Sequence, residues 1–382
     1  MSKPAMPLAK PLIVLAAGGT GGHVFPAEAL AAELQDRGYR LALITDKRGG
    51  GYGGALGDLE THHVRAGGIA GKRLTARLES VIKLGFGTLQ ARSLLGRLKP
   101  GAVVGFGGYA SVPTMVAATW SDCRTAIHEQ NAILGRTNRL LAARVGRIAT
   151  SFDATKGLPD GAEDKVVQTG MPVRTAFTAV GSTPYPPLAG DAPLNILITG
   201  GSQGARALSD VVPSALARLE DGFKARLNVI QQCRAEDLDR VRDAYDTAGI
   251  KAELASFFGD IPERLAAAHL LIARAGASTV AEMTAVGRPA ILVPYPHATD
   301  DHQSANAHAV DAVGAGWLMA EDVFTPERLA ERIHSLFAQP VHLERAAAAA
   351  KRVGRADAAA RLADLVAGMI SNGNDNAGRQ AA

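Results

Sequence analysis

Cysteine is scarce in this sequence. Cys123 and Cys233 are the two cysteines among 382 residues, which is too few for a disulfide framework, and neither lies at a spacing typical of a metal site. A reducing compartment such as the cytoplasm is the simplest home for such a chain.

Long apolar runs are also lacking. No stretch approaches the roughly 18 uninterrupted apolar residues of a membrane-spanning helix. The first apolar run, Leu12–Ala17, is shorter than the core of a signal peptide and leads directly into a glycine loop. We therefore expect a soluble or peripheral protein. Its net charge of +4 suits an anionic ligand or membrane surface but is common in proteins with neither.

The sequence lacks the signatures of several cofactors. Its glycine loops do not match G-x-G-x-x-G, and they lack the lysine of a Walker loop. Asp237-Leu-Asp239 is the only Asp-x-Asp, and it falls in a segment with the composition of a polar helix. The pair Asp300-Asp301 has no flanking aspartate at the spacing of metal-dependent transferases. We therefore expect neither a nicotinamide cofactor nor a metal.

Short apolar runs alternate with amphipathic segments along the whole chain, which is typical of parallel sheets covered by helices. Their continuous Val, Ile, Leu and Ala content predicts strands buried on both faces. The predicted strands are Leu12–Ala17, Leu41–Thr45, Ala102–Phe106, Thr125–His128, Arg147–Thr150, Leu194–Thr199, Leu227–Gln231, Leu270–Ala273 and Ala290–Pro294. The fold class is α/β.

An internal similarity predicts two domains. Leu12–Gly22 aligns with Leu194–Gly204, since each is an apolar strand followed by a Gly-Gly-[Thr/Ser]-x-Gly loop and a helix. A proline-rich segment separates the halves. We expect domains at residues 1–173 and 174–343, an alanine-rich helix at about 344–370 that joins the first domain, and a disordered tail at 371–382.

Both glycine loops open helices, whose first N–H groups lack partners and carry roughly half a positive charge. Such a turn suits a phosphate, although a plain tight turn is the alternative. His23 follows the first loop, where the helix dipole disfavours its cationic form. A neutral imidazole can act as a general base; a capping or packing histidine is the alternative.

Polar clusters follow other predicted strands, at the edge where open α/β sheets bind ligands. Gly105–Ser111 and Ile127–Asn131 are such clusters in the first half, although His128 or Glu129 could instead cap a helix. In the second half, Ser278 or Thr279 would begin a helix whose N–H groups could meet a diphosphate, with Glu282 available to ribose hydroxyls. An ordinary cap with a solvated Glu282 is the alternative.

A basic amphipathic stretch runs from about residue 72 to residue 97. Apolar side chains recur there at helical spacing among basic ones, which predicts either a membrane-facing helix or an ordinary half-buried one. The apolar residues are Leu74, Leu78, Val81, Ile82, Phe86 and Leu89, and the basic ones are Lys72, Arg73, Arg77, Lys83 and Arg92.

Taken together, these motifs resemble the MurG family of N-acetylglucosaminyltransferases. They are GGTGGH at 18–23, GFGGY at 105–109, HEQN at 128–131, TGMPVR at 169–174, GGSQGA at 200–205, AGASTVAE at 275–282 and HQxxNA at 302–307, and they cover roughly residues 12–316. Departures from the family pattern are Met171, the FFGDI turn at 257–261 and His302.

The resemblance implies a GT-B fold, with two Rossmann-like domains and a cleft between them. It implies transfer of N-acetylglucosamine, with inversion, from the UDP sugar to the 4-hydroxyl of the muramyl residue on undecaprenyl diphosphate, in peptidoglycan synthesis. Metal, cofactor and nucleic acid would have no part in this reaction. The enzyme would lie peripherally at an anionic membrane surface, on the cytoplasmic face of the plasma membrane.

The resemblance also implies roles for individual residues. His23 would be the general base, with Tyr109 and Glu129 near the acceptor. From the first domain, Thr20, Gly21, Gly22 and Asn131 would reach the sugar. The donor would be bound by Arg174, Ser202, Phe258, Ala277, Ser278, Thr279, Val280, Ala281, Glu282 and Gln303.

Three other functions compete with this one. A UDP-sugar epimerase could share the fold and the donor but would need no lipid acceptor. A nicotinamide-dependent oxidoreductase would need the dinucleotide fingerprint that the sequence lacks. A non-catalytic UDP-sugar-binding subunit is the third alternative, although both halves keep their ligand-facing motifs.

Overall fold

The computed structural model describes residues 10–19, 21–47, 52–67, 74–188, 190, 192–201 and 204–380, with side chains for all of these except 74–79 and 372–380. Contacts divide the chain into two compact units. Unit 1 comprises Met1–Gln130, Leu134–Pro172 and Asp357–Ala382, and unit 2 comprises Asn131–Ile133 and Val173–Ala356.

Unit 1 is built on a seven-stranded sheet whose strand order is β3-β2-β1-β4-β5-β6-β7, and all of its pairings are parallel. Its strands are β1 (Leu12–Ala16), β2 (Arg40–Thr45), β3 (Glu60–His63), β4 (Ala102–Gly105), β5 (Arg124–Glu129), β6 (Arg147–Thr150) and β7 (Val166–Gln168). Its helices are α1 (Gly21–Asp36), α2 (Gly54–Gly57), α3 (Leu74–Leu98), α4 (Gly108–Ala118), α5 (Arg136–Leu141) and α15 (Ala358–Gln380), with a 3-10 turn at Glu163–Lys165.

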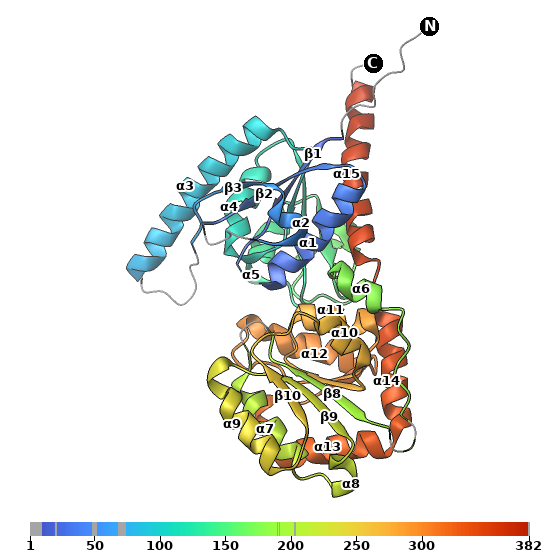
Figure 1. The fold of residues 1–382 in the computed structure, drawn as a ribbon. Helices are drawn as coiled ribbons and strands as arrows, with labels where there is room; N and C mark the ends of the chain where they lie inside the picture. The colour runs from blue at the N-terminus through green and yellow to red at the C-terminus, as the bar shows by residue number, and fades with distance from the viewer. Residues whose placement is uncertain are drawn as a thin grey trace. The chain divides into compact units, whose positions relative to one another are not determined.

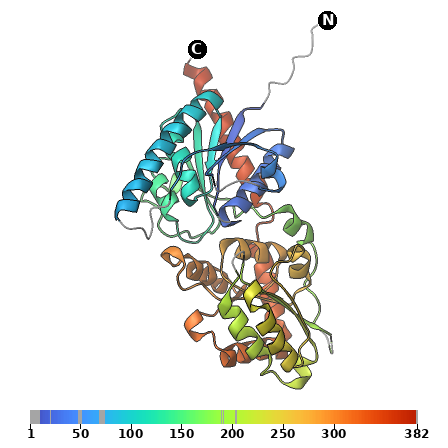
Figure 2. The same cartoon turned by 60° about the vertical axis from the view of Figure 1, so that its left-hand side comes forward.

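Helices cover both faces of the unit 1 sheet (Figures 1 and 2). Side chains alternate along a strand, so Val14 packs in a core with α3 and α4, whereas Ile13 and Leu15 pack with α1 and α15 on the other face. Coverage on both faces explains why the central strands are continuously apolar. Within the described residues, no helix is both long enough and apolar enough to cross a membrane.

Unit 2 is built on a six-stranded sheet with strand order β10-β9-β8-β11-β12-β13, again with parallel pairings throughout. Its strands are β8 (Leu194–Thr199), β9 (Leu227–Gln232), β10 (Ala252–Ala255), β11 (Leu270–Ala273), β12 (Ala290–Leu292) and β13 (Gly316–Leu318). Its helices are α6 (Thr175–Val180), α7 (Arg206–Leu216), α8 (Asp221–Lys224), α9 (Leu238–Thr247), α10 (Ile261–Ala267), α11 (Ala277–Val286), α12 (His302–Ala312), α13 (Pro326–Ala338) and α14 (Pro340–Val353). Three 3-10 turns lie at Ala235–Asp237, Thr299–Asp301 and Glu321–Val323.

Each of the nine predicted strands corresponds to a strand of the structure. The four strands that the sequence did not indicate are β3, β7, β10 and β13, and these are the edges of the two sheets. An edge strand pairs on one side only and is less covered, so its sequence need not be apolar. β3 is the clearest case, because its residues Glu-Thr-His-His are largely exposed.

The alanine-rich stretch near the C-terminus forms two helices where the sequence predicted one. Helix α14 ends at Val353, and Gly354 lies so close to α11 that an added Cβ would be 2.2 Å from the carbonyl oxygen of Thr284. Contacts place α14 in unit 2 and α15 in unit 1. Helix α15 extends to Gln380, beyond the start of the predicted tail.

Helix α15 completes the core of unit 1. Leu362, Ala363 and Val366 are fully buried beside α1 and the sheet. At the surface, the Arg37 guanidinium of unit 1 donates to the Asp364 carboxylate at 2.5 Å and to the carbonyl oxygen of Ala360 at 3.1 Å. Helix α15 is therefore part of the first folding unit.

We expect Leu362→Ala to lower the free energy of unfolding of unit 1 by about 2–5 kcal/mol, because it leaves a cavity in a fully packed core. Urea denaturation of the full chain, followed by hydrogen exchange of β1 and β4, measures this loss. Ser371→Ala, an exposed change on the same helix, is the control and should have little effect. Equal stability of the two variants would contradict the assignment of α15 to the core.

Candidate active site

His23 and the glycines after β4 come together in unit 1. His23 lies in the first turn of α1, and its imidazole packs on the backbone of Gly107 and Gly108, which have φ values of +81° and +70°. A Cβ on Gly108 would lie 3.0 Å from Cδ2 and 3.3 Å from Nε2 of His23. Glycine is therefore required at this place both by its backbone conformation and by the imidazole beside it.

His128 is part of the sheet rather than a free base. Its ring is fully buried, Nε2 donates to the carbonyl oxygen of Gly170 at 3.0 Å, and Nδ1 accepts from Nε2 of Gln130 at 3.2 Å. Burial lowers the pKa of His128 to about 4. It is therefore neutral at physiological pH and holds β5 to the segment after β7.

Glu129 is also buried, and its carboxylate is directed at the protein. Oε2 accepts from the backbone N–H of Gly135 and from Nδ2 of Asn138, each at 2.8 Å. These bonds fix the start of α5. Glu129 therefore acts much like a helix cap, which is the alternative role that the sequence left open. Asn138, to which the sequence assigned no role, also donates to the carbonyl oxygen of His128. Tyr109, in contrast, is 37% exposed at the start of α4.

The second glycine loop follows β8, the strand of unit 2 that corresponds to β1. Gly200 is packed so closely that a Cβ would lie 2.3 Å from the backbone nitrogen of Ala205. Ahead of it, Thr199 donates from its hydroxyl to the Gln232 side chain at 2.7 Å and accepts from the Gly201 N–H at 3.3 Å. Two predicted site residues, Thr20 of the first loop and Ser202 of the second, lie outside the described residues.

Helix α11 begins without a side-chain cap from the described residues. Its N-cap is Gly276, and the N–H groups of Ala277, Ser278 and Thr279 form its first turn. Among the described atoms, the Oγ of Ser278 is buried and has no hydrogen-bond partner. A buried hydroxyl without a partner is rare in folded proteins, and here it stands at the positive end of a helix, where an anion would be stabilised.

Glu282 and Arg174 form an ion pair on the flank of α11. Nη2 of Arg174 lies 3.4 Å from Oε1 of Glu282, whose side chain is 16% exposed. Burial raises the pKa of Glu282 to about 7, and the nearby charge of Arg174 lowers it only in part. Helix α11 therefore has an uncapped first turn and also carries Glu282, a carboxyl group whose charge changes near neutral pH.

The remaining predicted donor residues are held from several sides. Gln303 Oε1 accepts from the Tyr295 N–H at 2.9 Å, which fixes the amide at the start of α12. Asp300 and Asp301, just before it, adopt left-handed backbone angles that are uncommon for residues other than glycine. Phe258 is buried beneath the guanidinium of Arg264, which lies 4.4 Å from its ring centroid.

Asn306 is a buried residue to which the sequence assigned no role, and it connects several of the motifs. It is fully buried in α12, its Oδ1 accepts from the Ala132 N–H at 2.9 Å, and its Nδ2 donates to Asn131 Oδ1 and to the carbonyl oxygen of Ala275, both at 3.1 Å. One amide thus joins three motifs. The available signal was its place in the HQxxNA motif at 302–307, in which the sequence assigned a role to Gln303 alone.

The described residues hold no group of three or more His, Cys, Asp or Glu side chains that could bind a metal.

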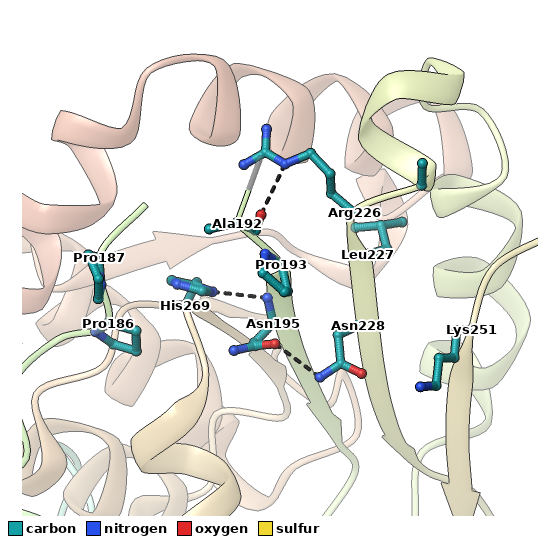
Figure 3. Close-up of a pocket in the computed structure, with 11 residues that line it drawn as sticks. Pro186, Pro187, Ala192, Pro193, Asn195, Arg226, Leu227, Asn228, Lys251 and His269 are labelled. Atoms are coloured by element: carbon teal, nitrogen blue, oxygen red, sulfur yellow. Dashed lines mark hydrogen bonds between the residues drawn. The ribbon is translucent and has the colours of Figure 1, made fainter. Parts of the chain in front are cut away.

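A shallow pocket of about 580 Å³ lies at the other edge of the unit 2 sheet, where β8 and β9 begin (Figure 3). There His269 accepts from the Asn195 N–H, and the Asn228 amide donates to the Asn195 side chain. This is the edge opposite the glycine loop and α11, so we do not place the sugar nucleotide in this pocket.

Comparison with known proteins identifies the family. Residues 13–150 match the glycosyltransferase family 28 N-terminal domain, and residues 195–362 match the C-terminal domain of that family. A curated UDP-N-acetylglucosamine--N-acetylmuramyl-(pentapeptide) pyrophosphoryl-undecaprenol N-acetylglucosamine transferase from Paramagnetospirillum magneticum is 61% identical over 95% of this chain and 98% of its own length. The protein of the same name from Rhodospirillum rubrum is 57% identical over 93% of this chain and 91% of its own. This chain belongs to the MurG family.

Solved structures agree with this assignment. The crystal structure of Acinetobacter baumannii MurG is 30% identical, has a TM-score of 0.75, and is matched over 93% of this chain and 99% of that one. A UDP-GlcNAc 2-epimerase from Neisseria meningitidis matches with a TM-score of 0.65 at 14% identity, over 95% of this chain and 100% of that one, which shows the fold alone. The expected GT-B fold is confirmed, and this MurG family member is a glycosyltransferase.

We expect Glu282 to make stability depend on pH with a definite sign. Since its folded pKa of about 7 exceeds the ordinary value of 4.5, the folded state keeps a proton that the unfolded chain releases. Stability relative to Glu282→Gln should therefore fall as pH rises from about 4.5 to 7, by on the order of 3 kcal/mol. Urea denaturation of both proteins at several pH values measures the difference, and a constant difference would contradict a raised pKa.

Proposed function

We propose that this protein transfers N-acetylglucosamine from UDP-N-acetylglucosamine to the 4-hydroxyl of the muramyl residue on an undecaprenyl-diphosphate-linked precursor, with inversion. The observation that carries the proposal is its identity of 61% and 57%, over nearly the whole chain, with relatives named for this transfer. The side chains at the carboxyl ends of both sheets support it, since they offer a base in unit 1 and an anion site in unit 2.

His23 is the general base in this proposal. The acceptor oxygen attacks the anomeric carbon, the bond from that carbon to the UDP oxygen breaks, and the imidazole takes the acceptor proton. Gly107 and Gly108 leave room for the ring and hold it against the backbone. Gly21 and Gly22, which open α1, lie directly before His23, and with Thr20 they form the sugar-facing turn in this proposal. Asn131 also binds the sugar in this proposal, although the sequence placed it in the first domain and contacts assign it to unit 2.

Helix α11 receives the departing diphosphate. The N–H groups of Ala277, Ser278 and Thr279, with the Ser278 hydroxyl, meet negative charge that increases as the bond breaks, and such fixed donors favour the transition state. Glu282 accepts from the ribose hydroxyls, and Arg174 lies near the uridine. Val280 and Ala281 continue the same helix, and the second glycine loop with Ser202 completes the diphosphate site.

The sugar and the uracil have their own contacts. Gln303 binds sugar hydroxyls through the amide nitrogen, because its oxygen already accepts from Tyr295. Main-chain atoms of Phe258 recognise the uracil base. At the acceptor side Tyr109 contacts substrate, whereas Glu129, whose carboxylate is bonded to Gly135 and Asn138, positions α5.

The acceptor is a lipid, and unit 1 has an exposed apolar surface suited to a membrane. Val81, Ile82, Phe86 and Leu89 of α3 are each more than half exposed. At about 100° per residue, Ile82, Phe86 and Leu89 fall within an arc of roughly 60° on the helix. Lys83 and Arg92 lie on the same helix and would attract anionic lipid. Lys72 and Arg73 of the predicted surface lie outside the described residues, as do the side chains of Leu74, Arg77 and Leu78.

We therefore propose that α3 rests on the anionic surface of the cytoplasmic face of the plasma membrane, where lipid-linked acceptor and soluble donor meet.

The decisive experiment for the whole function uses radiolabelled UDP-N-acetylglucosamine and vesicles with the lipid-linked muramyl acceptor. Label should move into the lipid fraction. Release or isomerisation of the sugar without an acceptor would favour the epimerase alternative, and binding without turnover would favour a non-catalytic subunit.

We expect His23→Ala to lower kcat by about 10²–10⁴-fold, because general-base assistance contributes about that much. UDP affinity, measured by calorimetry, should stay within about twofold, since the nucleotide binds unit 2. His342→Ala, at an exposed histidine of α14, is the control. Nearly full turnover by the His23 variant would exclude its role as the base.

We expect the triple change Ile82→Ser, Phe86→Ser and Leu89→Ser to weaken sedimentation with phosphatidylglycerol vesicles by at least about tenfold. Burial of one such side chain contributes about 1.5–3 kcal/mol, and the loss of three exceeds the equivalent of about 1.4 kcal/mol per factor of ten. Val341→Ser with Val353→Ser, at exposed apolar residues of α14, is the matched control. Unchanged vesicle binding by the triple variant would remove α3 from the membrane surface.

A further inference from the structure

The segment from Arg174 to Pro184 lies along α11 and is tied to it in three places. We call this segment the strap; it contains α6 and the start of the proline-rich linker. Its first tie is the ion pair of Arg174 with Glu282. Helix α6 packs against α10 and α11, and α14 also packs against α11 (Figure 1).

Lys351 of α14 makes the second tie. Its Nζ donates to the carbonyl oxygen of Gly181 at 2.6 Å and to that of Ala285 at 2.9 Å, so one ammonium joins the strap to the last turn of α11. The stem of Lys351 lies against Gly287, where an added Cβ would be 3.0 Å from its Cδ. Partial burial and the charge of Arg288 lower the pKa of Lys351, but the two carbonyl dipoles favour its charged form.

Arg288 makes the third tie and is only 1% exposed. Its Nη2 donates to the carbonyl oxygens of Thr183 and Pro184 in the strap, at 3.3 Å and 2.9 Å. Nη1 donates to Val286 and Gly287 at the end of α11, and Nε donates to Ala266 near the end of α10. Among the described residues, every hydrogen-bond acceptor of this guanidinium is a carbonyl oxygen.

Two cations thus donate hydrogen bonds to three carbonyl groups of the strap, those of Gly181, Thr183 and Pro184. They also stand at the negative ends of α10 and α11, where helix dipoles stabilise positive charge. A buried cation without a carboxylate is costly unless all its donors are satisfied. The guanidinium of Arg288 meets this condition only while the strap is in place, so the strap and the ends of both helices are fixed together.

We propose that Lys351 and Arg288 are positioning residues for donor binding, because they hold the strap along α11 and thereby keep Arg174 beside Glu282. This role rests on the proposed function, in which α11 binds the diphosphate and Glu282 binds ribose. Neither cation touches the substrate in this proposal. They act through Arg174, whose position on the strap they determine.

The position of Arg174 affects the charge of Glu282. Among the described residues, Arg174 is the charged group that shifts the pKa of Glu282. On the neighbouring helices, Arg264 of α10 is paired with Glu253 and Asp260, and Lys351 lies at the far end of α11. Release of the strap should raise the pKa of Glu282 further, so that its carboxylate forms only at higher pH.

The test compares Lys351→Met and Arg288→Met with the wild type. UDP affinity is measured by calorimetry between about pH 6 and 8.5, and thermal melting confirms that each protein is folded. At pH 7 we expect UDP affinity to fall about five- to tenfold and the KM for UDP-N-acetylglucosamine to rise by a similar factor, with kcat within about twofold. The loss should shrink towards pH 8.5, because Glu282 then ionises in the variants as well.

Lys351→Arg should restore the affinity, since it keeps a cation at the strap, and Arg352→Met, an exposed change at the next residue of α14, is the matched control. Lys351 is largely exposed, so its methionine variant keeps the test valid if Arg288→Met does not fold. Folded Lys351→Met with the wild-type affinity and pH profile would overturn the proposal. If the proposed function itself were wrong, the result would be a different one, because the wild type would then bind no UDP or transfer no sugar.

Discussion

Parallel pairing is the constraint on which both units depend. When every strand of a sheet runs the same way, all carboxyl ends lie at one edge, and every loop that leaves a strand for a helix gathers there. In unit 1 this brings the helix after β1 to the glycines after the neighbouring β4, so that His23 meets Gly107 and Gly108. In unit 2 the same rule places the loop after β8 beside the start of α11, since β8 and β11 are neighbours.

Most of the central architecture could be predicted from the sequence, because strands buried on both faces must be apolar throughout. The edges could not be predicted, because β3 and β10 face solvent and carry residues such as Glu60 and Glu253. The break between α14 and α15 was also hidden. It depends on the close approach of Gly354 to Thr284, which is a tertiary contact that an alanine-rich pattern does not reveal.

The candidate site was predictable to a similar extent. Glycine loops and helix starts are local features, so the place of His23 and Ser278 at helix N-termini followed from the sequence. The direction of the Glu129 side chain did not, because its partners Gly135 and Asn138 become neighbours only when α5 packs. Glu282 shows the same limit. From the sequence, a carboxylate in the first or second turn of a helix is expected to be solvated. In the structure, packing buries Glu282, which raises its pKa, and the charge of Arg174 offsets this rise only in part.

The return of the chain from α14 to unit 1 has a consequence for biosynthesis. Leu362 and Val366 belong to the core of unit 1, yet about 180 residues of unit 2 are translated before them. As unit 1 leaves the ribosome, α1 already covers part of this face of its sheet, but the apolar surface that α15 buries stays uncovered until α15 has been synthesised. Domains generally fold in order of synthesis, but here the first unit to emerge is the last to be completed, and a nascent chain that stops before residue 357 lacks the part of its core that Leu362 and Val366 supply.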